Sequence, residues 1–401
     1  MPKTYFKTNV YDAAIERINT VFDHFERVCV AFSGGKDSTV TLHLALEVAR
    51  KRGKTPVHAM LIDLEGQYKA TIDHVFEMFS DPDIKPWWIC LPINLRNACS
   101  VHHPYWCAWE PGGEWVRDMP QHPAVINDQS FFPWYQYRME FEEFVPRFNE
   151  WLSKDIGTAF LVGIRADESM NRYKAVRKSA TIKKCAWNNI QWSSKFKKKD
   201  KSVSFYPIYD WRFEDIWKYI GEKNLSYNRL YDYMYLAGYP PVEMRICQPY
   251  GDDQRKGLDM FHKIEPETWF RIVQRVEGAN WGAHYAKQKL MGYKSGLGLP
   301  PTFSTWQQYA EFMLHTMPPD WRAIYDRRIK VFLDWWAEHE YPTNQVPDKA
   351  KRRLEGKKKV PSWRRICMSI IKMDMGKSLS FGFCRKDTDR LIDIKNKYDN
   401  L

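Results

Sequence analysis

The side chains best suited to chemistry lie together in residues 31–39, which are Ala31, Phe32, Ser33, Gly34, Gly35, Lys36, Asp37, Ser38 and Thr39. A short β-branched run before this stretch predicts a buried strand, and apolar residues at helical spacing after it predict a helix. The two glycines let the main chain approach a ligand closely. Because a helix N-terminus offers free N–H groups and partial positive charge, the stretch predicts a phosphate or sulfate site.

The order of residues in this loop is not that of a Walker A motif. That motif needs Gly, four residues and then Gly-Lys-Ser/Thr, whereas here Asp37 follows Lys36 and the upstream glycine is missing. The order Ser-Gly-Gly-Lys-Asp-Ser resembles the PP-loop of the ATP pyrophosphatase superfamily. A purely structural Gly-Gly turn is the alternative, but such a turn has no use for the flanking Ser, Lys and Asp.

A second strand is predicted over residues 56–63 and ends on Asp63. Strand, helix and strand in this order form the unit of a parallel α/β sheet, in which ligands bind beyond the carboxyl ends of the strands. Asp37 and Asp63 are therefore candidates for Mg²⁺, which bridges carboxylates to phosphate oxygens. Asp63 could instead cap a helix or hold the adenosine part of a nucleotide directly.

A third strand, residues 158–165, ends on Arg165. Its guanidinium would face the phosphates, where its fork can hold two oxygens. The alternative is an arginine paired with Asp167 or Glu168. Lys36, Asp37 and Arg165 are the residues that we expect to act in catalysis, by positioning and by electrostatic stabilisation.

Two further segments extend the resemblance. Residues 163–169 resemble the second signature of phosphoadenosine phosphosulfate (PAPS) reductases, and residues 206–220 resemble the third. The likeness covers about residues 25–250, with Asn228-x-x-Tyr231 inside it. It implies an α/β fold of the adenine nucleotide alpha hydrolase type, with a parallel twisted sheet between helices on both faces. It also implies a site for ATP or a related adenine nucleotide, made by residues 31–39, Asp63, Gly163, Ile164, Arg165 and Arg172.

One feature of those reductases is absent. They end in a Glu-Cys-Gly-x-His tail or carry paired cysteines for an iron–sulfur cluster, whereas here Cys247, Cys367 and Cys384 stand singly. A four-cysteine ligand set is hard to assemble from them, so no iron–sulfur cluster is expected. Reduction of a sulfonucleotide by a thiol is put in doubt.

The stretch 90–133 is irregular and rich in Trp, Pro and Gly. Cys99, His102 and Cys107 have spacings that zinc sites use. Buried reduced cysteines and ordinary loop histidines are the alternative. A further interpretation is a substrate-specific loop, because it follows the carboxyl end of a strand.

At 401 residues the chain predicts two domains: a nucleotide-binding domain, 1–250, and a mainly helical domain, 251–401. Helices are expected at 265–289, 306–316, 324–339 and 363–373. The whole arrangement resembles a bacterial and phage branch of the family whose members are called immunoglobulin-binding regulator A. That likeness implies a ParB-like partner protein.

The formal net charge of +12 favours anionic partners. Basic clusters at 195–201 (Lys195 to Lys201) and 351–359 (Lys351 to Lys359) could bind nucleic acid or form solvated loops. No apolar run reaches 18 residues, the N-terminus lacks a signal-peptide core, and eight cysteines are scattered. These features predict a cytoplasmic protein with reduced thiols and no membrane span.

The leading hypothesis is an enzyme that cleaves the α–β phosphate bond of ATP, transfers the adenylyl group to an unknown acceptor and releases pyrophosphate. One alternative is a PAPS-type sulfonucleotide reductase. Another is a nucleotide-dependent regulator of gene expression that binds nucleic acid through its basic loops, since fold alone does not determine function.

Overall fold

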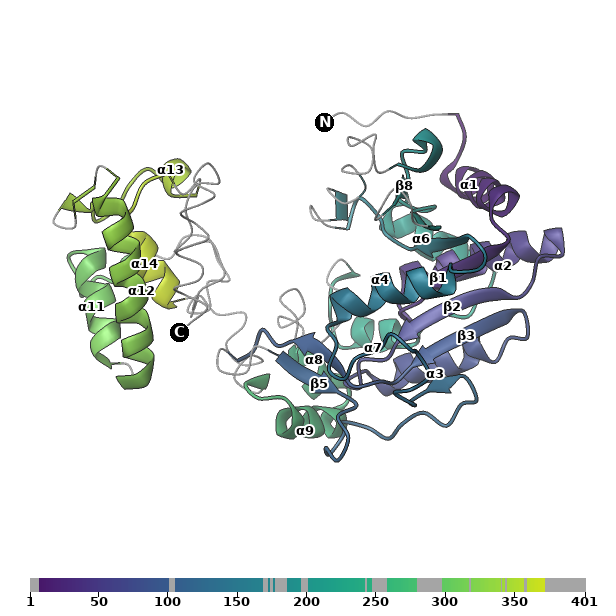
Figure 1. The fold of residues 1–401 in the computed structure, drawn as a ribbon, viewed down its shortest axis with the longest axis horizontal. Helices are drawn as coiled ribbons and strands as arrows, with labels where there is room; N and C mark the ends of the chain where they lie inside the picture. The colour runs from purple at the N-terminus through teal and green to yellow at the C-terminus, as the bar shows by residue number, and fades with distance from the viewer. Residues whose placement is uncertain are drawn as a thin grey trace. The chain divides into compact units, whose positions relative to one another are not determined.

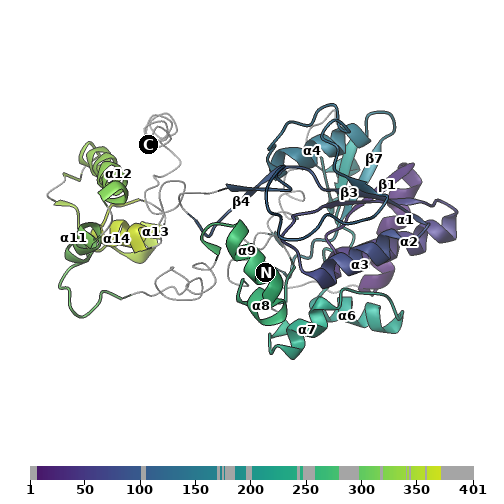
Figure 2. The ribbon, with the colours of Figure 1, turned by 90° about the horizontal axis from the view of Figure 1, so that it is seen from below.

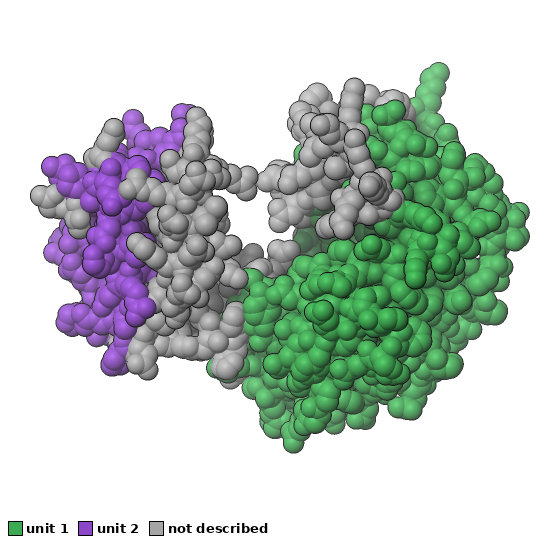
Figure 3. All heavy atoms as spheres, in the orientation of Figure 1, with its two compact units in different colours: residues 1–280 green, residues 281–401 purple. Residues whose placement is uncertain are grey.

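The computed structural model describes residues 7–100, 105–168, 172–173, 176, 186–195, 201–241, 244–246, 258–279, 298–316, 319–339, 341–342, 345–356 and 359–371. Within the chain, two compact units are distinguished, residues 1–280 and 281–401 (Figure 3). The first unit thus extends past residue 250, where the sequence placed a domain boundary, and includes two more helices.

One sheet of seven strands forms the centre of the first unit (Figure 1), in the order β6-β3-β2-β1-β7-β9-β8. All neighbours are parallel except β8, which runs antiparallel to β9. The strands are β1 (Arg27–Ala31), β2 (Val57–Ile62), β3 (Ile84–Ile89), β6 (Val125–Ile126), β7 (Thr158–Val162), β8 (Ser193–Ser194) and β9 (Ser202–Phe205). The chain runs outward from β1 to β2 on one side and reaches β7 on the other. A topological switch point therefore lies between β1 and β7.

Helices cover both faces of this sheet, with α4 on one side and α2 and α3 on the other (Figure 2), which confirms the predicted fold class. The helices of the first unit are α1 (Val10–His24), α2 (Lys36–Arg52), α3 (Lys69–Phe79), α4 (Phe141–Leu152), α6 (Phe213–Glu222), α7 (Leu230–Leu236), α8 (Leu258–Ile264) and α9 (Pro266–Arg275), with a 3₁₀ turn at Trp187–Asn189. Helix α2 carries an acid in its first turn and three basic residues in its last, which complements its dipole.

A two-stranded hairpin, β4 (Ile93–Arg96) and β5 (Tyr105–Ala108), lies within the stretch that looks irregular in the sequence. The sequence did not predict it. Its strands have only four residues each, which is too short for the alternation that marks a strand to stand out.

The expected helix 265–289 is shorter in the structure. Helix α9 ends at Arg275, since Val276 is extended and Gly278 has a φ of +79°. The Gly278 main chain also lies so close to Cys99 that an added Cβ would clash with the Cys99 carbonyl oxygen. The rest of the predicted helix, 280–289, falls outside the described residues.

The second unit is helical, as expected, with α11 (Trp306–Thr316), α12 (Pro319–Ala337), α13 (Arg352–Gly356) and α14 (Trp363–Ile371). Buried aromatic side chains from α11 and α12, including Trp306, Tyr325, Phe332 and Trp336, pack with Ile366 and Cys367 of α14 into one core. Across the described parts of both units, no helix combines the length and the hydropathy needed to cross a bilayer.

Candidate functional site

The glycine loop, residues 32–38, joins β1 to the N-terminus of α2. Gly34 has a φ of +69°, and a Cβ there would lie 3.0 Å from Thr71 Cγ2, so both backbone angle and space call for glycine. Gly35 caps α2 without a side-chain hydrogen bond. The cap residue therefore provides no side-chain acceptor for the first N–H groups of α2. Their acceptors must come from a ligand or from another element of the fold.

Two serines close the loop on itself. The Ser33 hydroxyl lies 3.0 Å from that of Ser38, and the Ser33 N–H donates to Ser38 Oγ over 3.2 Å. Ser38 Oγ in turn donates to the Gly35 carbonyl over 2.9 Å. Ser33 is exposed, whereas Gly34, Gly35, Lys36 and Ser38 are buried. The loop is held in shape by its own hydroxyls and reaches solvent at Ser33.

Three of the predicted residues form one charge network. Asp37 Oδ2 forms an ion pair with Lys36 Nζ at 3.1 Å. Asp37 Oδ1 accepts a hydrogen bond from Arg165 Nε. The side chains of Lys36 and Arg165 are each only 4% exposed, so two nearly buried cations share one anion. Arg165 is paired with Asp37 in place of the alternative partners Asp167 and Glu168.

Close contact between β7 and α2 brings this network together. An added Cβ at Gly163 would lie 2.8 Å from the Asp37 carbonyl oxygen and 2.9 Å from Thr41 Oγ1. Only glycine therefore lets the end of β7 approach the first turn of α2 at the switch point. The next residue, Ile164, is half-buried, and its N–H donates a hydrogen bond to the Val162 carbonyl. Arg165 follows directly after this turn.

Other predicted nucleotide-site residues have internal partners. Ala31 ends β1 in register with Met60 and Val162. Phe32 is buried, and Thr39 Oγ1 lies 3.0 Å from His74 Nε2, inside the unit. Arg172 pairs with Glu168 over 3.3 Å with its side chain 42% exposed. The structure thus does not bring these side chains into the charge network, and their binding role stays a prediction.

Asp63 lies at the carboxyl end of β2, as predicted, but its side chain is fully buried. Its Oδ1 accepts from the Glu65 N–H at 3.0 Å and from Arg117, and its Oδ2 accepts from Trp88 Nε1 at 2.8 Å. Arg117 in turn lies over the Trp109 ring. Asp63 therefore positions Arg117 at the strand end. Arg117 was not among the site residues predicted from the sequence.

Glu65 is a second buried acid at this strand end. It is fully buried, with a φ of +59°. Its carboxylate accepts from the main-chain N–H groups of Trp109 at 2.6 Å and Val116 at 2.9 Å, and it pairs with Arg275 of α9 at 3.2 Å. Glu65 thus joins the strand end, the inserted segment and α9. Its place two residues after a predicted strand was the only sequence signal.

The predicted magnesium ligands do not fit a shared two-carboxylate site here. Both oxygens of Asp37 bind protein cations, and both oxygens of Asp63 bind protein donors. Among the residues that the structure describes, no three His, Cys, Asp or Glu side chains are grouped as metal ligands. Magnesium therefore stays a prediction.

The predicted zinc site is only partly described, since His102 falls outside the described residues. Cys99 and Cys107 are both buried. Burial, with Glu110 nearby, raises the pKa of the Cys107 thiol to about 12, so in the metal-free chain it is protonated. Zinc stays a prediction.

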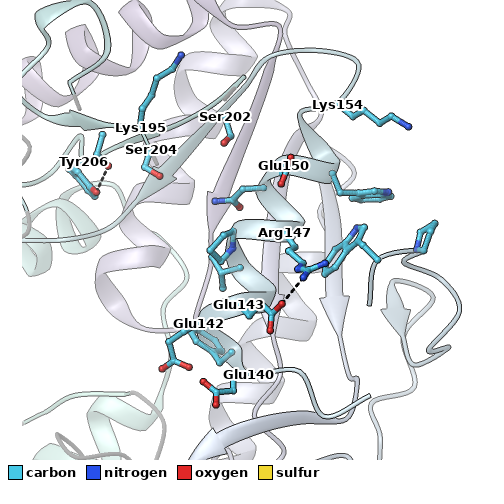
Figure 4. A pocket seen from close by; sticks show the side chains of 18 residues that line it. Glu140, Glu142, Glu143, Arg147, Glu150, Lys154, Lys195, Ser202, Ser204 and Tyr206 are labelled. Carbon is cyan, nitrogen blue, oxygen red and sulfur yellow. Dashed lines mark hydrogen bonds and ion pairs between the residues drawn. The ribbon is translucent and has the colours of Figure 1, made fainter. Parts of the chain in front are cut away.

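A large hollow lies elsewhere, beside α4 and the β8–β9 edge (Figure 4). It has a volume of about 1640 Å³, and charged side chains such as Glu143, Arg147 and Lys154 line it. None of its lining residues belongs to the glycine loop. The basic cluster that starts at Lys195, on its rim, continues through residues 196–200, which are not described.

The second predicted basic cluster is also only partly described. Lys351, Arg352 and Arg353 lie at the start of α13, and Lys359 follows it, whereas residues 357–358 are outside the description. Lys351 and the two arginines are exposed. Nucleic-acid binding therefore stays a prediction for both clusters.

A family model described as the phosphoadenosine phosphosulfate reductase domain matches residues 27–85 and 130–238, and one described as a domain of unknown function, DUF3440, matches 238–345. The chain is 39% identical over 379 residues to the protein YbdN of Escherichia coli, across 93% of this chain and 90% of that protein.

More distant relatives include enzyme subunits. The chain is 25% identical over 261 residues to subunit 2 of the sulfate adenylyltransferase of Saccharophagus degradans, across 63% of this chain and 74% of that protein. Among solved structures, FMN adenylyltransferase of Candida glabrata with FMN and an ATP analogue matches with a TM-score of 0.33 and 15% identity, across 56% of this chain and 58% of that one. The branch of immunoglobulin-binding regulator A is not identified by these matches.

Proposed function

Because this chain belongs to the same family as Escherichia coli YbdN and carries a PAPS reductase domain of the PP-loop superfamily, we propose that it is an adenylyl-transferring enzyme. It would bind ATP with the phosphates at the glycine loop and cleave the α–β bond. The observation that carries the proposal is the network of Lys36, Asp37 and Arg165 at the N-terminus of α2. Relatives that are sulfate adenylyltransferase subunits support the same chemistry and a partner subunit.

In the proposed reaction an oxygen of the acceptor attacks the α-phosphorus and forms a new bond to it. The bond from that phosphorus to the bridging oxygen breaks, and its electron pair leaves with pyrophosphate, while the acceptor proton passes to solvent. Negative charge therefore grows on the leaving pyrophosphate. Lys36, Arg165 and the N–H groups of α2 can stabilise this charge electrostatically.

Asp37 has a defined part in this scheme. In the free chain its single negative charge is shared by two cations that are nearly buried, because an unpaired buried charge is costly. When triphosphate arrives, its oxygens offer the same cations a second anion. Asp37 then serves to orient Lys36 and Arg165 toward the phosphates. Because the acceptor itself attacks the phosphorus, the reaction requires no nucleophilic side chain.

Isotope exchange tests the proposal. Radiolabelled pyrophosphate and ATP are incubated with the chain and with fractions of a small-molecule extract as a source of acceptor. We expect label to enter ATP with at least one fraction, and Lys36→Ala to abolish the exchange. A chain that binds ATP but exchanges no pyrophosphate with any fraction, alone or with candidate partner proteins, contradicts the proposal.

A second candidate, sulfonucleotide reduction, is favoured by the family model and by a partial match to an adenosine 5'-phosphosulfate reductase. It needs a reactive thiol. The described cysteines Cys29, Cys90, Cys99, Cys107 and Cys367 are all buried, while Cys185, Cys247 and Cys384 are outside the description. The test is sulfite release from PAPS or adenosine phosphosulfate with a thiol reductant. Retention of function after every cysteine is changed to Ser would exclude this candidate.

A regulator that binds nucleic acid remains a third proposal, as does a ParB-like partner. The regulator proposal predicts an affinity for DNA or RNA that falls steeply as the salt concentration rises, because each phosphate contact releases counterions. Affinity that does not depend on salt contradicts it.

A further inference from the structure

The turn that leads into α7 lies directly against the glycine loop. Asn228, which is fully buried, donates from Nδ2 to the Gly34 carbonyl over 2.9 Å and to Thr71 Oγ1 over 3.0 Å. Its own carbonyl oxygen Oδ1 accepts from the Leu230 N–H at 2.9 Å. This amide therefore fixes the turn and the positive-φ glycine to each other, although they are 194 residues apart.

Tyr231, three residues further on, reaches the N-terminus of α2. The main-chain N–H of Lys36 donates to the Tyr231 hydroxyl over 3.0 Å, in a buried contact. An added Cβ at Gly35 would lie 3.5 Å from the same hydroxyl oxygen. Lys36 N–H belongs to the first turn of α2, whose N–H groups have no acceptor inside the helix and are the ones that bind anions. The hydroxyl thus occupies a position that suits a phosphate oxygen.

The Tyr231 ring is held independently of its hydroxyl. Trp217 packs edge-on against it at 5.4 Å, and Lys36 Nζ lies 5.3 Å from its centre. The Lys36 side chain and the Lys36 main chain therefore both contact Tyr231, one through the ring and one through the oxygen. Removal of the oxygen alone should leave the ring contacts in place.

We propose that Tyr231 is a phosphate-binding residue of this site, whose hydroxyl accepts from Lys36 N–H in the free loop and donates to a terminal phosphate oxygen in the complex. A phenol hydroxyl can play both parts. The proposal rests on the adenylyl-transfer function above and adds a specificity: the hydroxyl contacts the pyrophosphate part of ATP, so it distinguishes ATP from AMP.

The test compares Tyr231→Phe with Tyr227→Phe. Tyr227 lies on the same turn, but its hydroxyl bonds to Asp232 over 2.9 Å and not to the loop, which makes it a matched control. Affinities for ATP, inorganic pyrophosphate and AMP are measured by calorimetry. We expect Tyr231→Phe to weaken ATP and pyrophosphate binding about ten- to a hundred-fold, the range for a hydrogen bond to a charged group, and to leave AMP binding unchanged. Tyr227→Phe should alter none of them.

Three results overturn the proposal. An unchanged ATP affinity means that the hydroxyl makes no contact with phosphate. A tighter ATP affinity means that the hydroxyl competes with the ligand for Lys36 N–H. An equal loss for ATP and AMP means a structural role only, and the melting temperature of each variant checks that case directly.

These outcomes are separable from failure of the proposed reaction. If the wild-type chain prefers ATP to AMP, and Tyr231→Phe removes that preference, the Tyr231 assignment holds even when no pyrophosphate exchange is found. If exchange occurs and Tyr231→Phe changes neither the ATP affinity nor the KM for ATP, the reaction stands and the assignment fails. A wild-type chain that binds no ATP overturns both.

Discussion

Asp37 and Arg165 are 128 residues apart in the sequence, yet the Arg165 Nε donates a hydrogen bond to Asp37 Oδ1 where the end of β7 meets the first turn of α2. The contact joins the two sides of the topological switch point. The same carboxylate is also the ion-pair partner of Lys36. The two cations share one carboxylate, so the network keeps a net positive charge until another anion arrives.

Asp37→Ala should therefore destabilise the free chain and make it responsive to anions. Loss of the carboxylate leaves Lys36 and Arg165 nearly buried and unpaired, a change that typically costs about 3–5 kcal/mol. Pyrophosphate offers replacement oxygens, so we expect its addition to raise the melting temperature of Asp37→Ala more than that of the wild-type chain. Thermal unfolding with and without pyrophosphate measures both effects.

The control for this experiment is Glu222→Ala, which removes an exposed acid paired with Lys218 on α6. Exposed pairs contribute about 0–1 kcal/mol, so this variant should unfold like the wild type at every pyrophosphate concentration. Equal stabilisation of Asp37→Ala and wild type by pyrophosphate would mean that the anion does not bind at this network.

Gly163→Ala should disturb the same junction sterically. The added methyl group would lie 2.8 Å from the Asp37 carbonyl oxygen, and that oxygen is main chain and cannot turn aside. We expect about 1–3 kcal/mol of destabilisation, the usual range for overpacking, and weaker nucleotide binding as α2 is pushed from β7. Denaturant unfolding and ATP titration measure the two.

Gly221→Ala is the opposite case within the same unit. Gly221 lies in α6, and nothing stands within 4 Å of its added Cβ. Alanine there should stabilise the chain by about 0.5–1 kcal/mol, because it favours helix and restricts the unfolded chain. If both glycine variants lost stability equally, close packing at Gly163 would not be the cause.

The glycine loop and its strands could be predicted because their signals are local. The β-branched run, the paired glycines and the helical spacing fix β1, the loop and α2 within a few residues. Arg165 was placed at the end of its strand for the same reason. Its partner was not predictable, since only the strand order brings β7 next to β1.

Contacts that join distant segments were not predicted. Tyr231, Arg117 and Arg275 each reach the site from an element whose position the sequence does not encode locally. Asp63 shows the reverse case: its position was predicted, but its burial and its protein partners were not. A strand end gives the direction of a side chain, while the elements inserted later in the chain decide what it contacts.

Glu65→Gln should loosen the inserted segment without unfolding the sheet. The charged partner of Arg275 is lost. The N–H groups of Trp109 and Val116 bond to different carboxylate oxygens, so in glutamine one of them keeps a weaker amide oxygen and the other faces an NH2 group and loses its acceptor. Hydrogen bonds to a charged acceptor are roughly twice as strong as neutral ones. We expect amide hydrogen exchange to accelerate at Trp109 and Val116 while the exchange of β1 and β2 stays slow.

Glu114→Gln is the matched control, because Glu114 is exposed in the same segment. It should leave exchange at both amides unchanged. Unaltered protection at Trp109 and Val116 in Glu65→Gln would show that the buried ion pair to α9 does not hold this segment.

His74 should make the nucleotide-binding unit sensitive to acid. It is 3% exposed beneath the loop, and burial, aided by the nearby His43, lowers the pKa of its imidazole to about 4 from the ordinary 6.5. The folded chain thus takes up this proton less readily than the unfolded chain. Stability from this group is complete above pH 6.5 and declines as pH falls from 6.5 to 4, by about 3 kcal/mol in all.

His74→Gln isolates that contribution, since glutamine can still bond to the Thr39 hydroxyl, which lies 3.0 Å from His74 Nε2, and does not titrate. Its unfolding free energy should fall less than that of the wild type between pH 7 and pH 4. His262→Gln, at an exposed position on α8, should follow the wild-type curve. Because Thr39 is part of α2, acid should also weaken ATP binding in the wild type before global unfolding, and less so in His74→Gln. Parallel pH curves for His74→Gln and wild type would show that the imidazole is not the group that limits stability in acid.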